Sequence, residues 1–216
     1  MSDFYPRWIV AWLVTTGIGC TSAPVRYYTL TPAPDKTIPI SATTPTVDVR
    51  VVHISPQLDR AELLLRAGPT EVTVLENERW ASPVSDEIKD ALRLALRRRL
   101  SRTTGLHGDF SKLGLDIDVQ HLEAEFGRYA LIEVSWSATL SGGDQRSNGA
   151  RAGTCAFEDY EEISTGYVGI VEGYQREIAA LADGIAAVLS SSAGGIDAPC
   201  QKSIEGSAGG SGSKDQ

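Results

Sequence analysis

The sequence predicts an α+β domain in which two long amphipathic helices pack on a mixed, mostly antiparallel sheet, in the order strands, helix, strands, helix. Three observations predict this fold. Alternating apolar and polar residues mark half-buried strands near position 50 and again between positions 115 and 140. Apolar residues at three- and four-residue steps mark one helix after Pro83 and a second after Thr165. Short turn signals link the strands of each group, which favours antiparallel neighbours.

The first twenty residues resemble an export signal. The apolar run Trp8–Val14 follows Arg7 and is shorter than the roughly 20 residues that a membrane-spanning helix needs. Small residues then lead to Cys20, as in the bacterial lipoprotein signal. We therefore expect residues 1–19 to be a signal peptide and Cys20 to carry the lipid. Gly17 stands where such signals usually have Leu, so a non-lipidated secretory signal or a plain N-terminal anchor is the alternative.

Two segments of biased composition flank the predicted domain. Residues 20–46 contain four prolines between positions 32 and 45, which disfavour a helix and predict a lipid-anchored, proline-rich tether. Within it, Tyr27–Leu30 is apolar enough to dock as an edge strand. The α+β domain is expected over residues 47–192. Residues 193–216 are rich in Gly and Ser, cannot pack a core and predict a disordered tail.

The first half of the domain contains three predicted strands and a helix. The first strand passes through Val47–Val51, and two shorter ones, Leu63–Arg66 and Glu71–Leu75, flank a Gly-Pro turn. Ser82 is the predicted cap of the helix, with Pro83 at the first helical position, where its missing N–H is tolerated.

Charge argues against nucleic acid as a partner. The chain has a formal net charge of -8, whereas polyanions are held mainly by Lys and Arg. The cluster Arg97–Arg99 falls in the last turn of the predicted first helix, and Asp86 and Glu87 fall in its first turn. This order complements the helix dipole, which favours helix-end chemistry over the alternative, a site for phosphate or a lipid headgroup.

The second half predicts three strands and the closing helix. Apolar residues occupy odd positions in Leu115–Val119 but even positions after His121. This change predicts a β-bulge near His121. A turn at a Gly-Arg pair leads into a second long strand through Ile132–Leu140, and a third strand passes through Ala152–Ala156. The last helix, after Thr165, is expected to be about six turns long. Its apolar side is expected to pack on its own sheet, with another chain as the alternative.

No motif in the sequence predicts catalysis. The three histidines, His53, His107 and His121, have no partner at metal-ligand spacing, and a serine nucleophile elbow and a P-loop are both missing. The acidic segment Glu158–Glu162 is interpreted as a solvated loop, with a weak cation site as the alternative. We therefore expect no catalytic residue, no metal and no cofactor.

The remaining cysteines, Cys155 and Cys200, form an even pair in a chain that is predicted to reach an oxidising compartment. A disulfide between them is expected. Two separate buried thiols are the alternative.

The segment from Val51 to Leu100 resembles a known family. It contains Leu58-Asp59-Arg60, then Leu64-Leu65-Arg66, then Glu78-Arg79-Trp80-Ala81-Ser82-Pro83-Val84 at the start of a helix. Tyr27–Leu30, Trp136 and the final stretch Tyr174–Leu189 continue the likeness along nearly the whole chain. This arrangement resembles the PqiC-like ABC-type transport auxiliary lipoproteins.

The resemblance implies a non-catalytic lipoprotein at the periplasmic face of the envelope, usually anchored in the outer membrane. Such proteins work with an MCE-domain protein and a permease to move lipids or other hydrophobic molecules, as docking or ring-forming homo-oligomeric subunits. A secreted envelope enzyme or a free-standing ligand-binding domain is the alternative.

When the family's residues are matched to positions of this sequence, the resemblance implies that Cys20 is the acylation site. It also implies a group of six matching residues, which we call the signature cluster. The cluster either contacts a partner or holds the fold together. In the second case Trp80 would pack under the helix, and Asp59 would pair with Arg66 or Arg79. The signature cluster consists of Leu58, Asp59, Arg60, Arg66, Arg79 and Trp80.

Overall fold

The computed structural model describes residues 23–33, 44–102, 111–142, 150–151 and 154–191. The predicted signal peptide, Cys20, His107, Cys200 and the Gly/Ser-rich tail lie outside these residues. The described chain is an α+β fold with a mixed sheet of eight strands and two helices, which confirms the predicted class. The elements are β1 (Arg26–Tyr28), β2 (Thr46–Ile54), β3 (Glu62–Arg66), β4 (Val72–Trp80), α1 (Val84–Leu100), β5 (Lys112–Glu125), β6 (Tyr129–Ser141), β7 (Ala150–Arg151), β8 (Cys155–Glu162) and α2 (Tyr167–Ser191).

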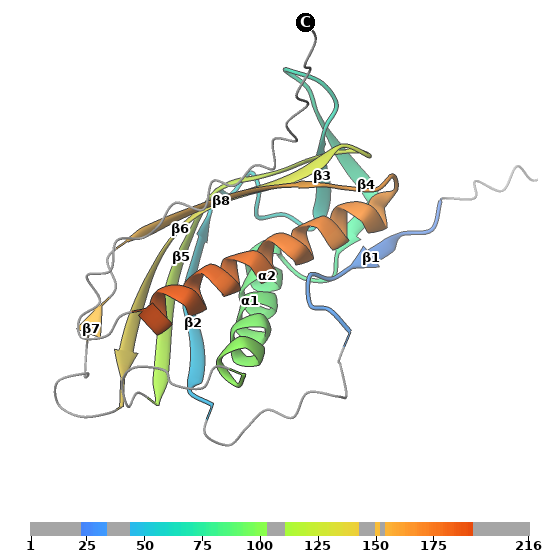
Figure 1. Cartoon of the computed structure of the whole chain (residues 1–216). Coiled ribbons are helices and arrows are strands. Elements are labelled where there is room, and N and C mark those ends of the chain that lie inside the picture. Colours follow the sequence, from blue (N-terminus) through green and yellow to red (C-terminus); the bar gives the residue numbers. More distant parts are fainter. Residues whose placement is uncertain (1–22, 34–43, 103–110, 143–149, 152–153, 192–216) are drawn as a thin grey trace, which may run out of the picture.

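The sheet is built around the long antiparallel pair β5–β6. β8 and the short β7 pair with β6 along its other edge, both antiparallel. β2 pairs with β5 in parallel, and farther along β5 the strand β3 takes its place, also parallel. β3 and β4 form an antiparallel hairpin, and β1 pairs in parallel with β4. Both helices pack on the same face of the sheet and against each other, as Figure 1 shows.

The predicted bulge in β5 is confirmed. The register of the β5–β6 pair shifts between Val119 and His121. Before the shift the core side chains include Ile117 and Val119, and after it Ala124 is fully buried. Because side chains alternate with a period of two, one extra residue places Ala124 on the same face as Ile117 and Val119.

α2 packs its apolar side on the chain's own sheet, as expected. It contacts β6, β8 and α1, and its 25 residues make about seven turns. Among the described residues, neither helix is long and apolar enough to cross a membrane. The fully buried large side chains of the core include Leu30, Leu63, Ile88, Leu92, Leu96, Leu113, Leu115, Ile117, Ile132, Ile170, Leu181 and Ile185.

The start of α1 differs from the prediction. β4 continues to Trp80, because β1 pairs with its last three residues, and Pro83 rather than Ser82 occupies the cap position. The Ser82 hydroxyl donates instead to Glu87, at 2.8 Å. The cap comes from a distant loop: Asp59 accepts the Ser85 backbone N–H at 3.0 Å and the Ser85 hydroxyl at 3.1 Å. Asp59 therefore satisfies an N–H that the helix itself leaves unpaired.

The acidic segment predicted as a loop is the strand β8, which pairs with β6 over eight residues. The free edge of β6 supplies main-chain hydrogen bonds that do not depend on the charge of the added strand's side chains. Glu158 and Glu162 point outward and stay exposed, so the charges need no burial. Cys155 is buried at the start of β8. Its pairing with Cys200 stays a prediction.

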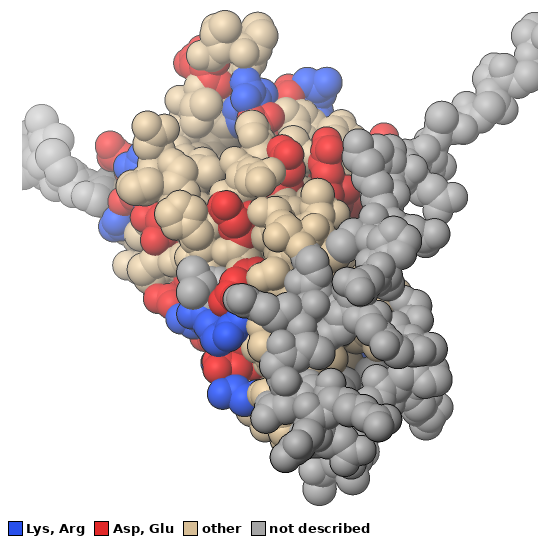
Figure 2. All heavy atoms as spheres, turned by 90° about the vertical axis from the view of Figure 1, so that its left-hand side faces the viewer, with Lys and Arg blue, Asp and Glu red and all other residues tan. Residues whose placement is uncertain are grey.

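The arginines that end α1 lie in its last turn, which agrees with helix-end chemistry. Arg99 also donates to Asp183 of α2 at 2.7 Å. Figure 2 shows basic and acidic side chains interspersed over the described part of one side of the molecule. This surface offers no continuous basic area that would suit a polyanion.

Glu177 is a carboxyl group buried under α2. It is fully buried, and neither of its oxygens makes a hydrogen bond of ordinary geometry among the described residues. Burial raises the pKa of Glu177 to about 9, and the neighbouring carboxylates Asp159 and Glu161 of β8 raise it further. Arg176 opposes this rise without cancelling it. Glu177 is therefore neutral at physiological pH.

Loss of the Asp59 cap should weaken the start of α1. We expect Asp59→Ala to lower the free energy of unfolding by about 1 kcal/mol, the typical loss for a missing N-terminal cap. Asp59→Asn keeps an oxygen that can accept the Ser85 N–H and should retain most of this stability. Urea unfolding of the three proteins measures the effect. Equal stability of the Ala and Asn variants would show that Asp59 does not act as a cap.

Glu177 should make the fold less stable at high pH. The unfolded chain releases this proton near pH 4.5, whereas the folded chain keeps it to about pH 9, so stability is complete below the first value and falls between the two. Glu177→Gln removes this titration and should raise the melting temperature at pH 9 but not at pH 4.5. Glu172→Gln, at an exposed position of α2, is the control. Parallel melting curves for Glu177→Gln and the parent at every pH would refute the assignment.

Candidate functional site

A pocket lies where β5 exchanges β2 for β3 as its neighbour. β2 ends at Ile54, opposite Val119, directly before the bulge, and β3 meets β5 only at Glu125. The gap between these pairings, together with the loop from Ser55 to Leu58, encloses a volume of about 300 Å³. This is at the lower end of the range for small-molecule pockets. Its lining residues are Ser55, Gln57, Leu58, Leu64, Leu65, Arg66, Val72, Gln120, His121, Leu122 and Glu123.

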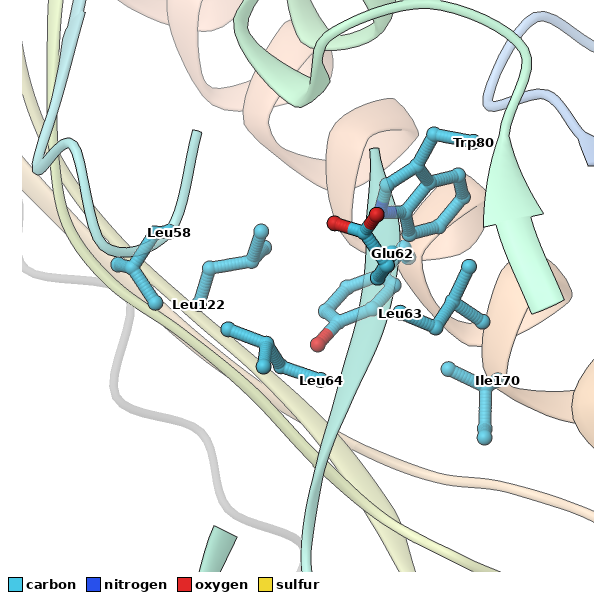
Figure 3. A pocket seen from close by; sticks show the side chains of 8 residues that line it. Leu58, Glu62, Leu63, Leu64, Trp80, Leu122 and Ile170 are labelled. Atoms are coloured by element: carbon cyan, nitrogen blue, oxygen red, sulfur yellow. The ribbon is translucent and has the colours of Figure 1, made fainter. Parts of the chain in front are cut away.

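A second, smaller cavity of about 20 Å³ lies on the inner side of the same region (Figure 3). Leu58, Leu64 and Leu122 line both cavities and so lie between them. On the inner side the lining is completed by Trp80 and by α2 residues that include Tyr174. The floor of the larger pocket is therefore apolar, whereas its rim carries polar groups of β5 and the loop.

Trp80 is a core residue. Its exposed fraction is 5%, and its ring lies 6.2 Å from that of Tyr174, tilted by 57°. Its backbone N–H donates to Ala61 at 2.7 Å. The structure thus favours the structural interpretation of Trp80, with α2 rather than α1 as the aromatic partner.

The arginines of the signature cluster bind carboxylates other than Asp59. Arg60 and Arg79 both bind Glu62, at the start of β3, with Arg60 Nε 3.2 Å from Glu62 Oε2. Arg66 binds Glu123. The predicted pairing of Asp59 with Arg66 or Arg79 is wrong, because Asp59 is engaged by the start of α1.

Glu123 is the polar centre of the pocket rim. It accepts hydrogen bonds from Arg66 of β3 and Tyr129 of β6, and His121 Nε2 lies 3.3 Å from its Oε2. The Arg66 guanidinium outweighs the effect of burial and, with Tyr129 and His121, lowers the pKa of Glu123 to about 2. Glu123 is therefore a permanent carboxylate that ties the β3–β4 hairpin to the central strands.

Two buried carboxylates hold the N-terminal strand and the segment directly after it. Glu78 accepts hydrogen bonds from Arg26 Nε at 2.9 Å and from the Tyr28 hydroxyl at 2.6 Å. Burial opposes ionisation of Glu78, but these two donors outweigh it and lower its pKa. Glu87 accepts the Leu30 backbone N–H at 2.9 Å and the Thr29 hydroxyl at 2.7 Å.

Sequence reasoning missed these acceptors, Glu62, Glu78, Glu87 and Glu123. Glu78 and Glu123 lie on strands and Glu87 on the first turn of α1, where acidic residues look like ordinary surface positions. One signal was present for Glu62, which directly precedes the apolar run of β3 and lies between two of the signature arginines.

The pocket rim also brings together Ser55, His121 and Glu123, residue types that form hydrolytic triads. Of these three side chains, only His121 and Glu123 are within hydrogen-bond distance of each other in the part of the chain that the structure describes. The Ser55 hydroxyl instead accepts the Gln57 N–H at 3.3 Å. His53 is exposed on β2, away from this pocket lining. No group of three or more metal-ligating side chains occurs among the described residues.

Two crystal structures share the fold. The first, of an uncharacterized protein, is 16% identical and covers 78% of this chain and 100% of its own, with a TM-score of 0.58. The second, a Xanthomonas campestris protein assigned to the family DUF330, is also 16% identical and covers 76% of this chain and 95% of its own, with a TM-score of 0.50. At this identity the likeness establishes the fold alone.

Sequence comparison supplies the family. No curated protein sequence matches the chain. The model of one family, described as the ABC-type transport auxiliary lipoprotein component, matches residues 28–186, from β1 into α2. Because this match covers well over half of the sequence, the chain belongs to the family of ABC-type transport auxiliary lipoprotein components.

Proposed function

We propose that this protein is a non-catalytic, lipid-anchored subunit of an MCE/ABC-type transport system that moves lipids or other hydrophobic molecules across the cell envelope. Its partners are an MCE-domain protein and a permease, and it assembles with copies of itself. Lipid on Cys20 holds it at the periplasmic face of the envelope, in the outer membrane. Family membership supports the transport role, and the shape of the β3–β4 hairpin supports action by contact.

The observation that supports action by contact is an exposed apolar surface on the β3–β4 hairpin. Val74 lies opposite Leu64, and Val72 opposite Arg66, so these side chains share one side of the hairpin with the pocket lining. Val72 is 55% exposed and Val74 is 39% exposed. We call Leu58, Leu64, Val72, Val74 and Leu122 the hairpin face.

The signature cluster holds this face in position. Its arginines are bound to Glu62 and Glu123, Asp59 caps α1, and Trp80 is buried. A hairpin that is fixed at its base in this way loses little conformational entropy when a partner binds. An exposed apolar surface beside a pocket is the kind of surface that binding proteins use. The signature residues other than Leu58 therefore shape the contact, and the hairpin face, to which Leu58 belongs, makes it.

Site-specific photo-crosslinking tests this contact. A benzophenone amino acid at Val74 should cross-link the MCE-domain protein, the permease or a second copy of this chain when cells are irradiated. The same amino acid at Arg93, exposed on α1, is the matched control and should give none of these products. Products are identified by mass spectrometry. The proposal fails if Val74 yields no such product, or if Arg93 yields the same products with equal efficiency.

A second candidate function is a ligand-binding domain or an envelope hydrolase. The observation that favours it is the pocket itself, which gathers Ser55, His121 and Glu123 at its rim. The ionised Glu123 can orient His121, but the described hydrogen bonds do not link His121 to Ser55. The arrangement therefore lacks the contact by which a histidine activates a serine.

An ester hydrolysis assay tests the hydrolase alternative. We expect the purified protein to hydrolyse a short-chain nitrophenyl ester no faster than buffer, and Ser55→Ala and His121→Ala to leave this background unchanged. Hydrolysis above background that both substitutions abolish would establish the hydrolase instead. Ser137→Ala, at a half-buried serine of β6 outside the pocket lining, is the control for general effects of substitution.

A further inference from the structure

We propose that one end of the domain, formed by Arg26, Phe126, Tyr167 and Val168, rests directly on the lipid surface to which Cys20 is attached. We call these four residues the anchor end. The inference rests on the proposed acylation of Cys20 and is independent of the proposed transport partners.

The first step is that the chain is fixed to the domain soon after the lipid cysteine. Arg26 follows Cys20 by only six positions, from 20 to 26. From Arg26 onward the chain is held by β1 pairing and by Glu78 and Glu87. Six residues span at most about 20 Å when fully extended. Most of the proline-rich segment follows β1 and therefore cannot lengthen the connection between lipid and domain.

The second step is the direction in which this connection leaves the domain. β1 is parallel to β4, β4 is antiparallel to β3, and β3 is parallel to β5. β1 therefore runs opposite to β5, and its N-terminal end points toward the C-terminal end of β5. The turn that follows β5 contains Phe126 and Gly127, whose positive φ of 67° allows the tight reversal into β6. The described chain thus enters β1 from the side of this turn.

The third step is the chemistry of that end. Phe126 is 47% exposed and Val168 is 59% exposed. The Phe126 ring meets the Tyr167 ring edge to face, with centroids 5.4 Å apart, and the Arg26 guanidinium lies 5.4 Å above the Tyr167 ring. In Figure 1, β1 and the first turn of α2 lie at the same end of the molecule, on the right.

These side chains suit a bilayer surface. Aromatic residues with one polar atom favour the headgroup level, where an apolar body and a polar tip are both accommodated. The exposed side chain of Arg26 can donate to lipid phosphates while Glu78 holds its buried side. By contrast, the outer side of β8 farther from the turn after β5 presents Glu158, which a surface of phosphates would repel. A water-filled gap at the anchor end would leave its apolar surface uncovered.

Quenching of introduced tryptophans by brominated lipids tests this arrangement. Lipidated full-length protein is purified from the envelope of its bacterial host, checked for acyl chains on Cys20 by mass spectrometry, and reconstituted into phosphatidylethanolamine and phosphatidylglycerol vesicles with brominated acyl chains. The reporter is Val168→Trp. The matched control is Ala187→Trp, exposed on the same helix about 28 Å farther along its axis, at 1.5 Å per residue. Trp80 and Trp136 are buried and supply the background that is subtracted.

We expect brominated lipid to remove most of the added fluorescence of Val168→Trp and almost none of that of Ala187→Trp. Phe126→Trp, a reporter on a different element, should be quenched like Val168→Trp, and circular dichroism melts confirm that each variant folds. Equal quenching at positions 168 and 187, or no quenching at 168 and 126, would overturn the proposal, as would an unacylated Cys20. Because no partner protein is present, these outcomes do not depend on the transport role.

Discussion

One extra residue in β5, between Val119 and His121, sets the positions of the pocket, the hairpin and the turn that follows the strand. The first part of β5 pairs with β2 and the last residue meets β3, so the strand serves two neighbours in succession. A bulge bends the strand and increases its twist, which separates these two neighbours. Between these two neighbours β5 therefore has no paired strand on this side. The loop from Ser55 to Leu58 lies beside this gap, and the gap forms the pocket.

Buried and half-buried carboxylates fix the parts that the bulge separates. Glu62 and Glu123 bind the arginines of the hairpin, whereas Glu78 and Glu87 bind the N-terminal strand and the segment after it. A paired buried carboxylate contributes little net stability when compared with an apolar core, but removing one partner leaves a costly unpaired charge. Such groups therefore specify one arrangement of the hairpin and the first strand. Glu177 shows the opposite case, because burial and the neighbouring carboxylates of β8 keep the group protonated.

The two surfaces that these contacts present are chemically different. The hairpin face is aliphatic and lies beside a pocket with a polar rim, which suits contact with a protein or with a single apolar group. The anchor end combines aromatic rings with a guanidinium, which suits the mixed polarity of lipid headgroups. A short connection to the lipid would leave the domain little freedom of orientation. The hairpin face would then be presented to partners in a nearly constant direction, so assembly would require less ordering.

The sequence by itself determined the class of fold, the bulge in β5, the apolar side of α2 and the family, because these depend on patterns within one segment: residue alternation, helical spacing and short motifs. Tertiary structure decided the cap of α1, the strand character of β8 and the partners of the signature arginines. Asp59 caps a helix that starts 25 positions later, and Arg66 binds a carboxylate 57 positions away. β8 is a strand because β6 offers it an edge, despite its charged composition. Local composition records none of these relations, since each pair meets only after the sheet has brought distant segments together.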